Sequence, residues 1–264
     1  FVERDDVLTM VEGLVHSLFA KLQLPVPAAI PRISYSEAIE KYGSDKPDLR
    51  VDMVIQDVSD LIGGQTGFGA FDQALAEGMR IKGLVVKGQA HITRKEQDHY
   101  KSIAQGANLP GLFFIAHTPE GYKSSLLKFL GEEKIAHICQ QMGAESGDLV
   151  ILAAAPSKDL SVALGKVRLE LAQHLNLLDP QRYEFLWVID FPMFSWNEEE
   201  NRLEAEHHPF TSPLPSDLER LESDPLSVRA AAYDLVLNGS ELASGSVRIH
   251  QRDLQARVLK CIGL

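Results

Sequence analysis

The sequence predicts an α+β protein in which a mainly antiparallel sheet with helices is interrupted by an inserted α/β-type domain. Two observations carry this prediction. The middle of the chain alternates strand and helix patterns, whereas the last part, 185–264, contains strands joined by hairpins and loops. We therefore assign 1–50 and 185–264 to one domain and 51–184 to the insertion. Two consecutive domains with a loose N-terminal helix are the alternative that composition leaves open.

The first segment begins with an amphipathic helix. From Asp5 to Leu24 the apolar residues recur at three- and four-residue steps, and Pro25 and Pro27 are expected to end the helix. A second helix is predicted over Ser34–Tyr42. The residues 42–50 that follow are predicted to form a loop, because turn-forming and charged residues dominate them.

The inserted segment contains three apolar runs and three helical patterns. Thr93, with Glu96 three residues later, has the spacing of a capping box at a helix start. The predicted strands are 80–87, 111–117 and 148–154, and the predicted helices are 93–107, 125–142 and 157–175.

The last segment returns to strands and tight turns. Asn238-Gly239 is typical of a two-residue hairpin turn. The predicted elements are a strand over 185–191, a polar turn over 197–201, a helix near 226–232, strands over 233–237 and 240–250, and a helix over 252–261.

Charge and composition exclude several functional classes. The formal net charge of −11 disfavours a protein that wraps duplex nucleic acid by bulk charge. Cys139 and Cys261 are the only cysteines, and neither has metal-ligand spacing, so we expect a reducing, cytoplasmic setting and no structural metal. No apolar run reaches a membrane span. The common glycine-rich nucleotide loops and hydrolase motifs are absent.

The clearest candidate site residues lie in the last segment: the pair His207-His208, and Glu241 and Arg248 in one predicted strand. A carboxylate, a guanidinium and imidazoles are the groups needed to hold a small anionic substrate beside a metal-bound nucleotide. The histidine pair could equally be a solvated loop. Because Glu241 and Arg248 are seven residues apart, a regular strand would point them to opposite faces, so we predict a bulge within 243–246 if both line one site.

Two charged stretches have two interpretations each. The loop with Asp45, Lys46, Asp48 and Arg50 is either a self-compensating surface turn or a rigid loop that borders the site. The inserted segment carries a modest basic strip that is either a solvated face or a phosphate contact. The strip comprises Arg80, Lys82, Lys87, His91, Arg94, Lys95 and Lys101.

Five motifs together give the chain a resemblance to bacterial-type aspartyl-tRNA synthetases, which are class II aminoacyl-tRNA synthetases. They are YGSDKPDLR at 42–50, HITRKEQD at 91–98, LWVIDFPMF at 186–194, HHPFTSP at 207–213 and YDLVLNGSELASGSVRIH at 233–250. They follow the family's order over nearly the whole chain. The resemblance implies a class II catalytic sheet interrupted by the bacterial insertion domain.

The resemblance also implies an activity: aspartate and ATP, with Mg²⁺, form aspartyl-adenylate, and the aspartyl group passes to tRNA(Asp) or also tRNA(Asn) in a homodimeric enzyme. His207, His208 and Arg248 fall on positions that bind aspartate, and Glu241 falls on the ATP and magnesium ligand. The family usually has three glycines after this acidic residue, whereas this chain has Ala243-Ser244-Gly245.

Relative to the family, the sequence lacks class II motifs 1, 2 and 3 and the anticodon-binding domain. We therefore expect a fragment of an aspartate–tRNA ligase that is inactive alone. The alternative is a non-catalytic module that binds tRNA or a protein partner through the insertion domain.

Overall fold

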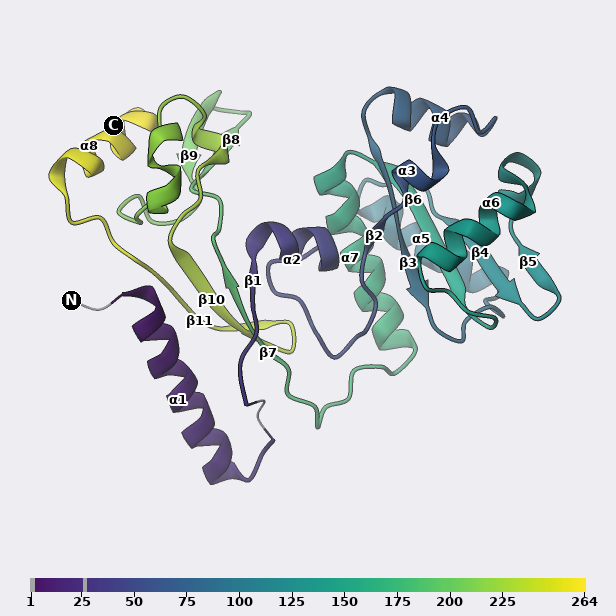
Figure 1. The fold of residues 1–264 in the computed structure, drawn as a ribbon, viewed down its shortest axis with the longest axis horizontal. Coiled ribbons are helices and arrows are strands. Elements are labelled where there is room, and N and C mark those ends of the chain that lie inside the picture. The colour runs from purple at the N-terminus through teal and green to yellow at the C-terminus, as the bar shows by residue number, and fades with distance from the viewer. Residues whose placement is uncertain (1–2, 26–27) are drawn as a thin grey trace. The chain divides into compact units, whose positions relative to one another are not determined.

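The computed structural model describes residues 3–25 and 28–264 and divides into two compact units (Figure 1). The first unit comprises the described parts of Phe1–Ala38 together with Asp45–Arg50 and Pro180–Leu264. The second unit comprises Ile39–Ser44 and Val51–Asp179, so the division falls within one helix, α2 (Tyr35–Tyr42). Within the described ranges, no helix is both long enough and apolar enough to cross a bilayer.

The first unit is built on a four-stranded sheet with the order β1-β7-β10-β11. β1 (Arg32–Ser34) pairs parallel with β7 (Phe185–Ile189), and the remaining pairs, β7 with β10 (Ala232–Leu237) and β10 with β11 (Ser240–Ser246), are antiparallel. Asn238 and Gly239 join β10 to β11 with positive φ angles of 50° and 82°, which confirms the predicted hairpin turn. The predicted strand 240–250 is too long, because β11 ends at Ser246.

The helix α1 (Arg4–Leu22) packs on one face of this sheet and confirms the first predicted helix. It ends before Pro25, as expected, while Pro27 lies outside the described residues. Leu8 and Val15 pack among strand residues that alternate toward α1, namely Phe185, Trp187, Tyr233 and Leu235. The opposite face packs against the other elements of this unit through Leu186, Val188, Ala232 and Val236.

The predicted helix near 226–232 is wrong. The structure has only a short 3-10 turn, η2 (Pro225–Ser227), and the chain then runs extended. The backbone N–H of Arg229 donates to the carboxylate of Asp217, and that of Ala230 donates to the carbonyl of Phe191. Partners distant in sequence therefore replace the helical hydrogen bonds.

The remaining elements of the first unit surround the second face. The predicted polar turn 197–201 joins β8 (Phe194–Asn197) to β9 (Arg202–Ala205), and the predicted last helix is α8 (Arg252–Cys261). A 3-10 helix, η1 (Pro215–Arg220), precedes η2.

The second unit contains a five-stranded sheet in which all neighbours are antiparallel. Its order is β2 (Gln56–Asp57), β3 (Arg80–Val86), β6 (Leu149–Ala155), β4 (Phe113–Thr118) and β5 (Gly121–Lys123). The three predicted strands are β3, β4 and β6. β6 occupies the centre, and all seven of its residues are buried, as its uninterrupted apolar sequence requires.

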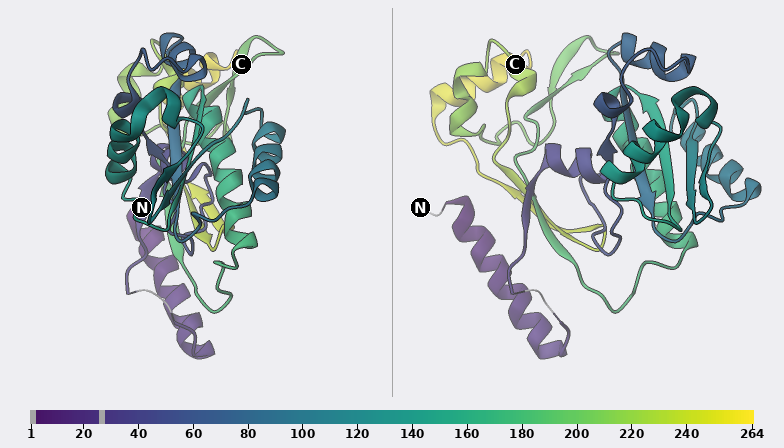
Figure 2. Two further views of the ribbon diagram at one scale, coloured as in Figure 1. Left: turned by 90° about the vertical axis from the view of Figure 1, so that its right-hand side faces the viewer. Right: turned by 45° about the vertical axis from the view of Figure 1, so that its right-hand side comes forward.

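Helices cover both faces of this sheet (Figure 2). The predicted helices are α5 (Arg94–Gly106), α6 (Leu127–Gln141) and α7 (Ser157–His174), and Thr93 and Glu96 form the predicted capping box. α5 and α7 contribute to the core on one face, whereas α3 (Ser59–Ile62), α4 (Gly69–Ala76) and α6 contribute to the core on the other. The short helices α3 and α4 were not predicted.

Candidate active site

The face of the first sheet opposite α1 carries a cavity of about 290 Å³. Its lining combines four carboxylates with an imidazole and two aromatic rings. The residues come from α2, the loop after it, the segments that follow β7 and β9, and the β10–β11 hairpin. The lining residues are Tyr35, Asp45, Phe191, Glu206, His207, Asp234, Glu241 and Ser244.

A bulge in β11 gives Glu241 its place in this cavity. Val236 pairs with Glu241 and Leu235 with Ala243, so Leu242 is an extra residue between them. Glu241 and Ser244, three residues apart, therefore share the face that carries Asp234. The bulge lies one residue before the segment 243–246 in which it was predicted.

Lys46 and Glu241 form an ion pair with the ammonium nitrogen 3.0 Å from the carboxylate. The hydrogen bond between them lowers the pKa of Glu241 and raises that of Lys46. Both side chains are about one-third exposed or more, so the pair orients Glu241 more than it stabilises the fold.

Asp234 is the most strongly perturbed group of the cavity. Its side chain is buried, and burial followed by the nearby charges of Glu241 and Asp45 raises its pKa to about 6. Two carboxylates on one cavity wall therefore repel each other near neutral pH, and a bound cation would relieve that repulsion.

His207 presents a nitrogen that the fold leaves unused. Its ring packs edge-to-face on Phe191 with 5.1 Å between the centroids, and its Nε2 is buried without a hydrogen-bond partner among the described residues. Burial lowers the pKa of His207, so the imidazole is neutral at pH 7. A substrate group can therefore bond to Nε2.

His208 does not line the cavity. Its Nδ1 accepts a hydrogen bond from the backbone N–H of Phe210 at 3.2 Å, and its ring packs on the Phe210 ring. In this structure His208 therefore stabilises the turn of its own loop.

The charged loop 45–50 divides into two parts. Asp45 lines the cavity, and Lys46 contacts Glu241. Asp48 is buried and accepts from Arg50, with Nη2 of Arg50 2.6 Å from the carboxylate, which fixes the turn itself. The loop thus contacts the cavity through Asp45 and Lys46, while Asp48 and Arg50 form an ion pair that is largely buried and not a surface turn.

Arg248 lies in another cavity of the same unit, of about 640 Å³. Its neighbours there include Glu3, Arg4 and Tyr233, and its backbone forms a β-bridge with Thr211. The structure thus does not bring Arg248 together with Glu241 and His207.

Sequence reasoning missed the residues whose environment comes from tertiary packing: Tyr35, Phe191, Glu206, Asp234 and Ser244. One signal existed, because Asp234 is an acidic residue inside the apolar strand sequence YDLVL.

Part of the basic strip of the second unit is neutralised by ion pairs. Lys82 is fully buried and contacts Glu40 at 2.7 Å, Arg80 contacts Asp57 at 2.7 Å, and Lys87 contacts Asp148 at 2.9 Å. These ion pairs disfavour Arg80, Lys82 and Lys87 as phosphate contacts.

The cavity is suited to a metal ion held jointly with a ligand. Within residues 3–25 and 28–264, no group of three or more histidine, cysteine or acidic side chains is arranged to hold a metal alone. Asp234 and Glu241 nevertheless supply two carboxylates, and Mg²⁺ that binds with a nucleotide takes one or two carboxylates plus phosphate oxygens.

In a comparison with known protein families, the chain matches one family. The model described as tRNA synthetases class II (D, K and N) matches residues 1–264. The chain is 43% identical over 265 residues to an aspartate–tRNA(Asp/Asn) ligase of Caldanaerobacter subterraneus and 44% identical over 271 residues to one of Symbiobacterium thermophilum. It is 42% identical over 265 residues to an aspartate–tRNA ligase of Agathobacter rectalis. All of this chain is covered, but only 44–46% of the length of these relatives.

Proposed function

The chain belongs to the class II tRNA synthetases of the D, K and N group, and we propose that it forms part of an aspartate–tRNA ligase. Relatives named as ligases for tRNA(Asp), or for both tRNA(Asp) and tRNA(Asn), support this proposal. The proposed reaction joins aspartate to ATP, which gives aspartyl-adenylate and pyrophosphate. The aspartyl group then moves to the terminal ribose of the tRNA.

The observation that carries the proposal is the acidic cavity on the first sheet. Asp45, Glu206, Asp234 and Glu241 all line it, so it favours positively charged groups. Aminoacyl-tRNA ligation uses ATP, generally with Mg²⁺. The substrates of the proposed reaction thus bring two cationic groups: the α-ammonium of aspartate and the magnesium that accompanies ATP.

Asp234 and Glu241 would hold the magnesium ion, which would neutralise phosphate charge when bound with ATP. Lys46 keeps the Glu241 carboxylate ionised and oriented at 3.0 Å. Because Asp234 has a pKa of about 6, it is mostly ionised at pH 7 and available to the metal.

Two neutral groups would orient the amino acid. His207 offers Nε2 for a hydrogen bond without adding charge. Burial, Glu206 and Asp45 raise the pKa of Tyr35, so its phenol stays a donor. We keep the aspartate-binding roles of Arg248 and His208 as predictions, because neither side chain lines this cavity.

The test replaces the matching segment of a full-length relative with this chain and measures aspartate-dependent ATP–pyrophosphate exchange. We expect exchange by the chimera and an approximately 100-fold loss in Glu241→Gln, the usual scale for a group that stabilises developing charge. Glu198→Gln, on the exposed β8–β9 turn, is the matched control. The chain alone, assayed in parallel, is expected to be inactive. A chimera whose Glu241→Gln variant matched the control would refute the proposal.

We further infer that the second unit is the inserted domain and that the whole enzyme is a cytoplasmic homodimer, as the resemblance implies. Sedimentation of the active chimera tests the dimer, and a monomer that retains activity would contradict it.

A further inference from the structure

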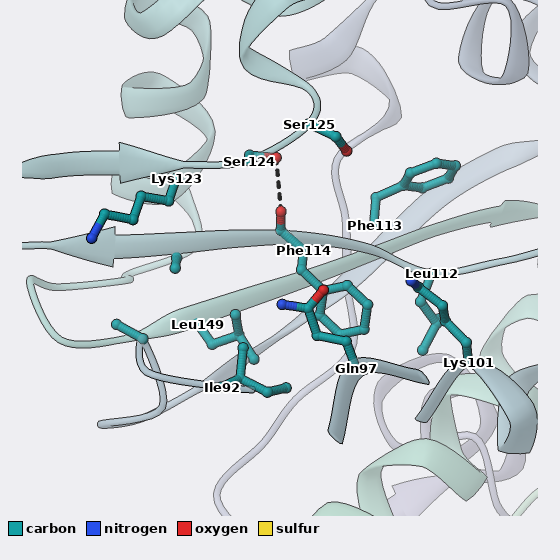
Figure 3. Close-up of a pocket in the computed structure, with 12 residues that line it drawn as sticks. Ile92, Gln97, Lys101, Leu112, Phe113, Phe114, Lys123, Ser124, Ser125 and Leu149 are labelled. Carbon is teal, nitrogen blue, oxygen red and sulfur yellow. Dashed lines mark hydrogen bonds between the residues drawn. The ribbon is translucent and has the colours of Figure 1, made fainter. Parts of the chain in front are cut away.

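The second unit carries a cavity of about 380 Å³ that lies in its own fold and takes no part in the function proposed above (Figure 3). Its floor is made of side chains from the core that α5 and α7 cover. Leu112, Phe114, Ala116 and Leu149 are each less than a tenth exposed. A ligand on this floor would therefore bury apolar surface against side chains that the fold already fixes.

Polar side chains from two elements surround the floor. Gln97 and Lys101 are four residues apart on α5 and so lie on one face of that helix, while Lys123 ends β5. Figure 3 shows the Gln97 carboxamide beside the Phe114 ring, with Lys123 on one side of the cavity and Lys101 on the other.

Part of this polar chemistry is unused by the fold. Ser124 donates to the Phe114 carbonyl at 2.7 Å, and Lys101 contacts the exposed carboxylate of Asp98 at 3.3 Å. By contrast, no hydrogen bond or ion pair holds the Gln97 carboxamide or the Lys123 ammonium in the described part of the chain, and the charge of Lys123 acts on the Glu120 carboxylate. A neutral amide over an apolar floor and a cation at its edge are thus both available to a ligand.

We propose that this cavity binds a nucleotide, with its base on the apolar floor and its phosphate at Lys123. A carboxamide offers a donor and an acceptor side by side, which matches the edge of a nucleobase. The ammonium group matches a phosphate that remains partly hydrated at the exposed rim. The volume lies within the usual range for small-ligand sites, from about 300 Å³ upward.

The same chemistry fits a free mononucleotide and one nucleotide of single-stranded RNA. Lys101 on the opposite side, whose ammonium lies over the Phe114 ring at 5.7 Å from its centroid, would then exchange its contact with Asp98 for the next phosphate of the strand. These are two sources of one ligand, and affinity for each distinguishes them.

The experiment titrates the ¹⁵N-labelled 264-residue chain with AMP and, separately, with a single-stranded tetraadenylate, and follows amide shifts by NMR. Shifts at Ile92, Gln97 and Leu112 report this cavity, whereas shifts near Asp234 report the first unit. The variants are Gln97→Leu and Lys123→Ala. Gln105→Leu, exposed on the same helix, and Lys158→Ala, exposed at the start of α7, are the matched controls.

We expect saturable shifts at the cavity amides, weakened about tenfold in Gln97→Leu and about threefold in Lys123→Ala, with both controls unchanged. Tighter binding of tetraadenylate assigns the site to a nucleic acid strand, and equal or tighter binding of AMP assigns it to a free nucleotide. The proposal is overturned if neither ligand gives saturable shifts up to about 10 mM, a Kd range that corresponds to negligible affinity. Equal weakening in the controls would overturn it as well.

Discussion

Replacing Asp217 by asparagine should destabilise the first unit by about 2–3 kcal/mol, because this buried carboxylate holds together a segment without regular secondary structure. Asp217 is 1% exposed. It accepts from the backbone N–H of Arg229 at 3.0 Å and from the Arg229 guanidinium at 2.8 and 2.9 Å. The guanidinium of Arg220 is 2.7 Å away.

The magnitude follows from these contacts. Each hydrogen bond loses about 1 kcal/mol when its acceptor changes from a carboxylate to a neutral amide. The Arg220 and Arg229 side chains are 44% and 45% exposed. Hydration of these side chains therefore offsets about half of the free energy lost from their hydrogen bonds to Asp217. The guanidinium of Arg229 also lowers the pKa of Asp217, so the stability it contributes is complete above pH ~4 and is lost as the pH falls below that value.

Urea unfolding followed by tryptophan fluorescence measures this effect selectively, because Trp187 and Trp196 are the only tryptophans and both lie in the first unit. Asp224→Asn, exposed in the same region, is the control and should stay within about 0.5 kcal/mol of the parent. An Asp217→Asn variant as stable as that control would refute the reasoning. So would a difference in unfolding free energy between the parent and Asp217→Asn that does not shrink between pH ~4 and pH ~2.

Three further predictions follow from the structure. Gly165→Ala should lower the stability of the second unit by about 2 kcal/mol, because the added Cβ would lie 2.6 Å from the Tyr42 carbonyl oxygen. The control Gly106→Ala places its Cβ in open space. Thermal unfolding followed by circular dichroism compares the two variants, and equal unfolding midpoints would contradict the prediction. Lys46→Met should raise the pKa of Asp234 above about 6, and an unchanged carboxyl titration by ¹³C NMR would argue against their coupling. Cys139 is fully buried, and burial raises the pKa of its thiol to about 11. It should therefore not react with a thiol reagent at pH 8 until the protein unfolds. Rapid reaction of both Cys139 and Cys261 in the folded protein would contradict this prediction.

Local patterns predicted the regular elements of the fold. The apolar run of β6, the capping box at Thr93 and the turn at Asn238-Gly239 each depend on residues close together in sequence, and the structure confirms them. The extended segment after Ser227 could not be predicted in this way, because Asp217 and Phe191 supply its hydrogen-bond partners from distant parts of the chain.

The candidate site shows the same division. The sequence by itself determined the family motifs and the acidic residue in β11. The bulge was predicted within 243–246 for a site shared by Glu241 and Arg248, whereas the structure has it at Leu242 and places Arg248 in another cavity. Only the tertiary structure decided that Asp234 lies beside Glu241 with a raised pKa, that Lys46 orients Glu241, and that Arg248 lines another cavity. Burial and charge proximity are properties of the packed chain, so no local pattern specifies them.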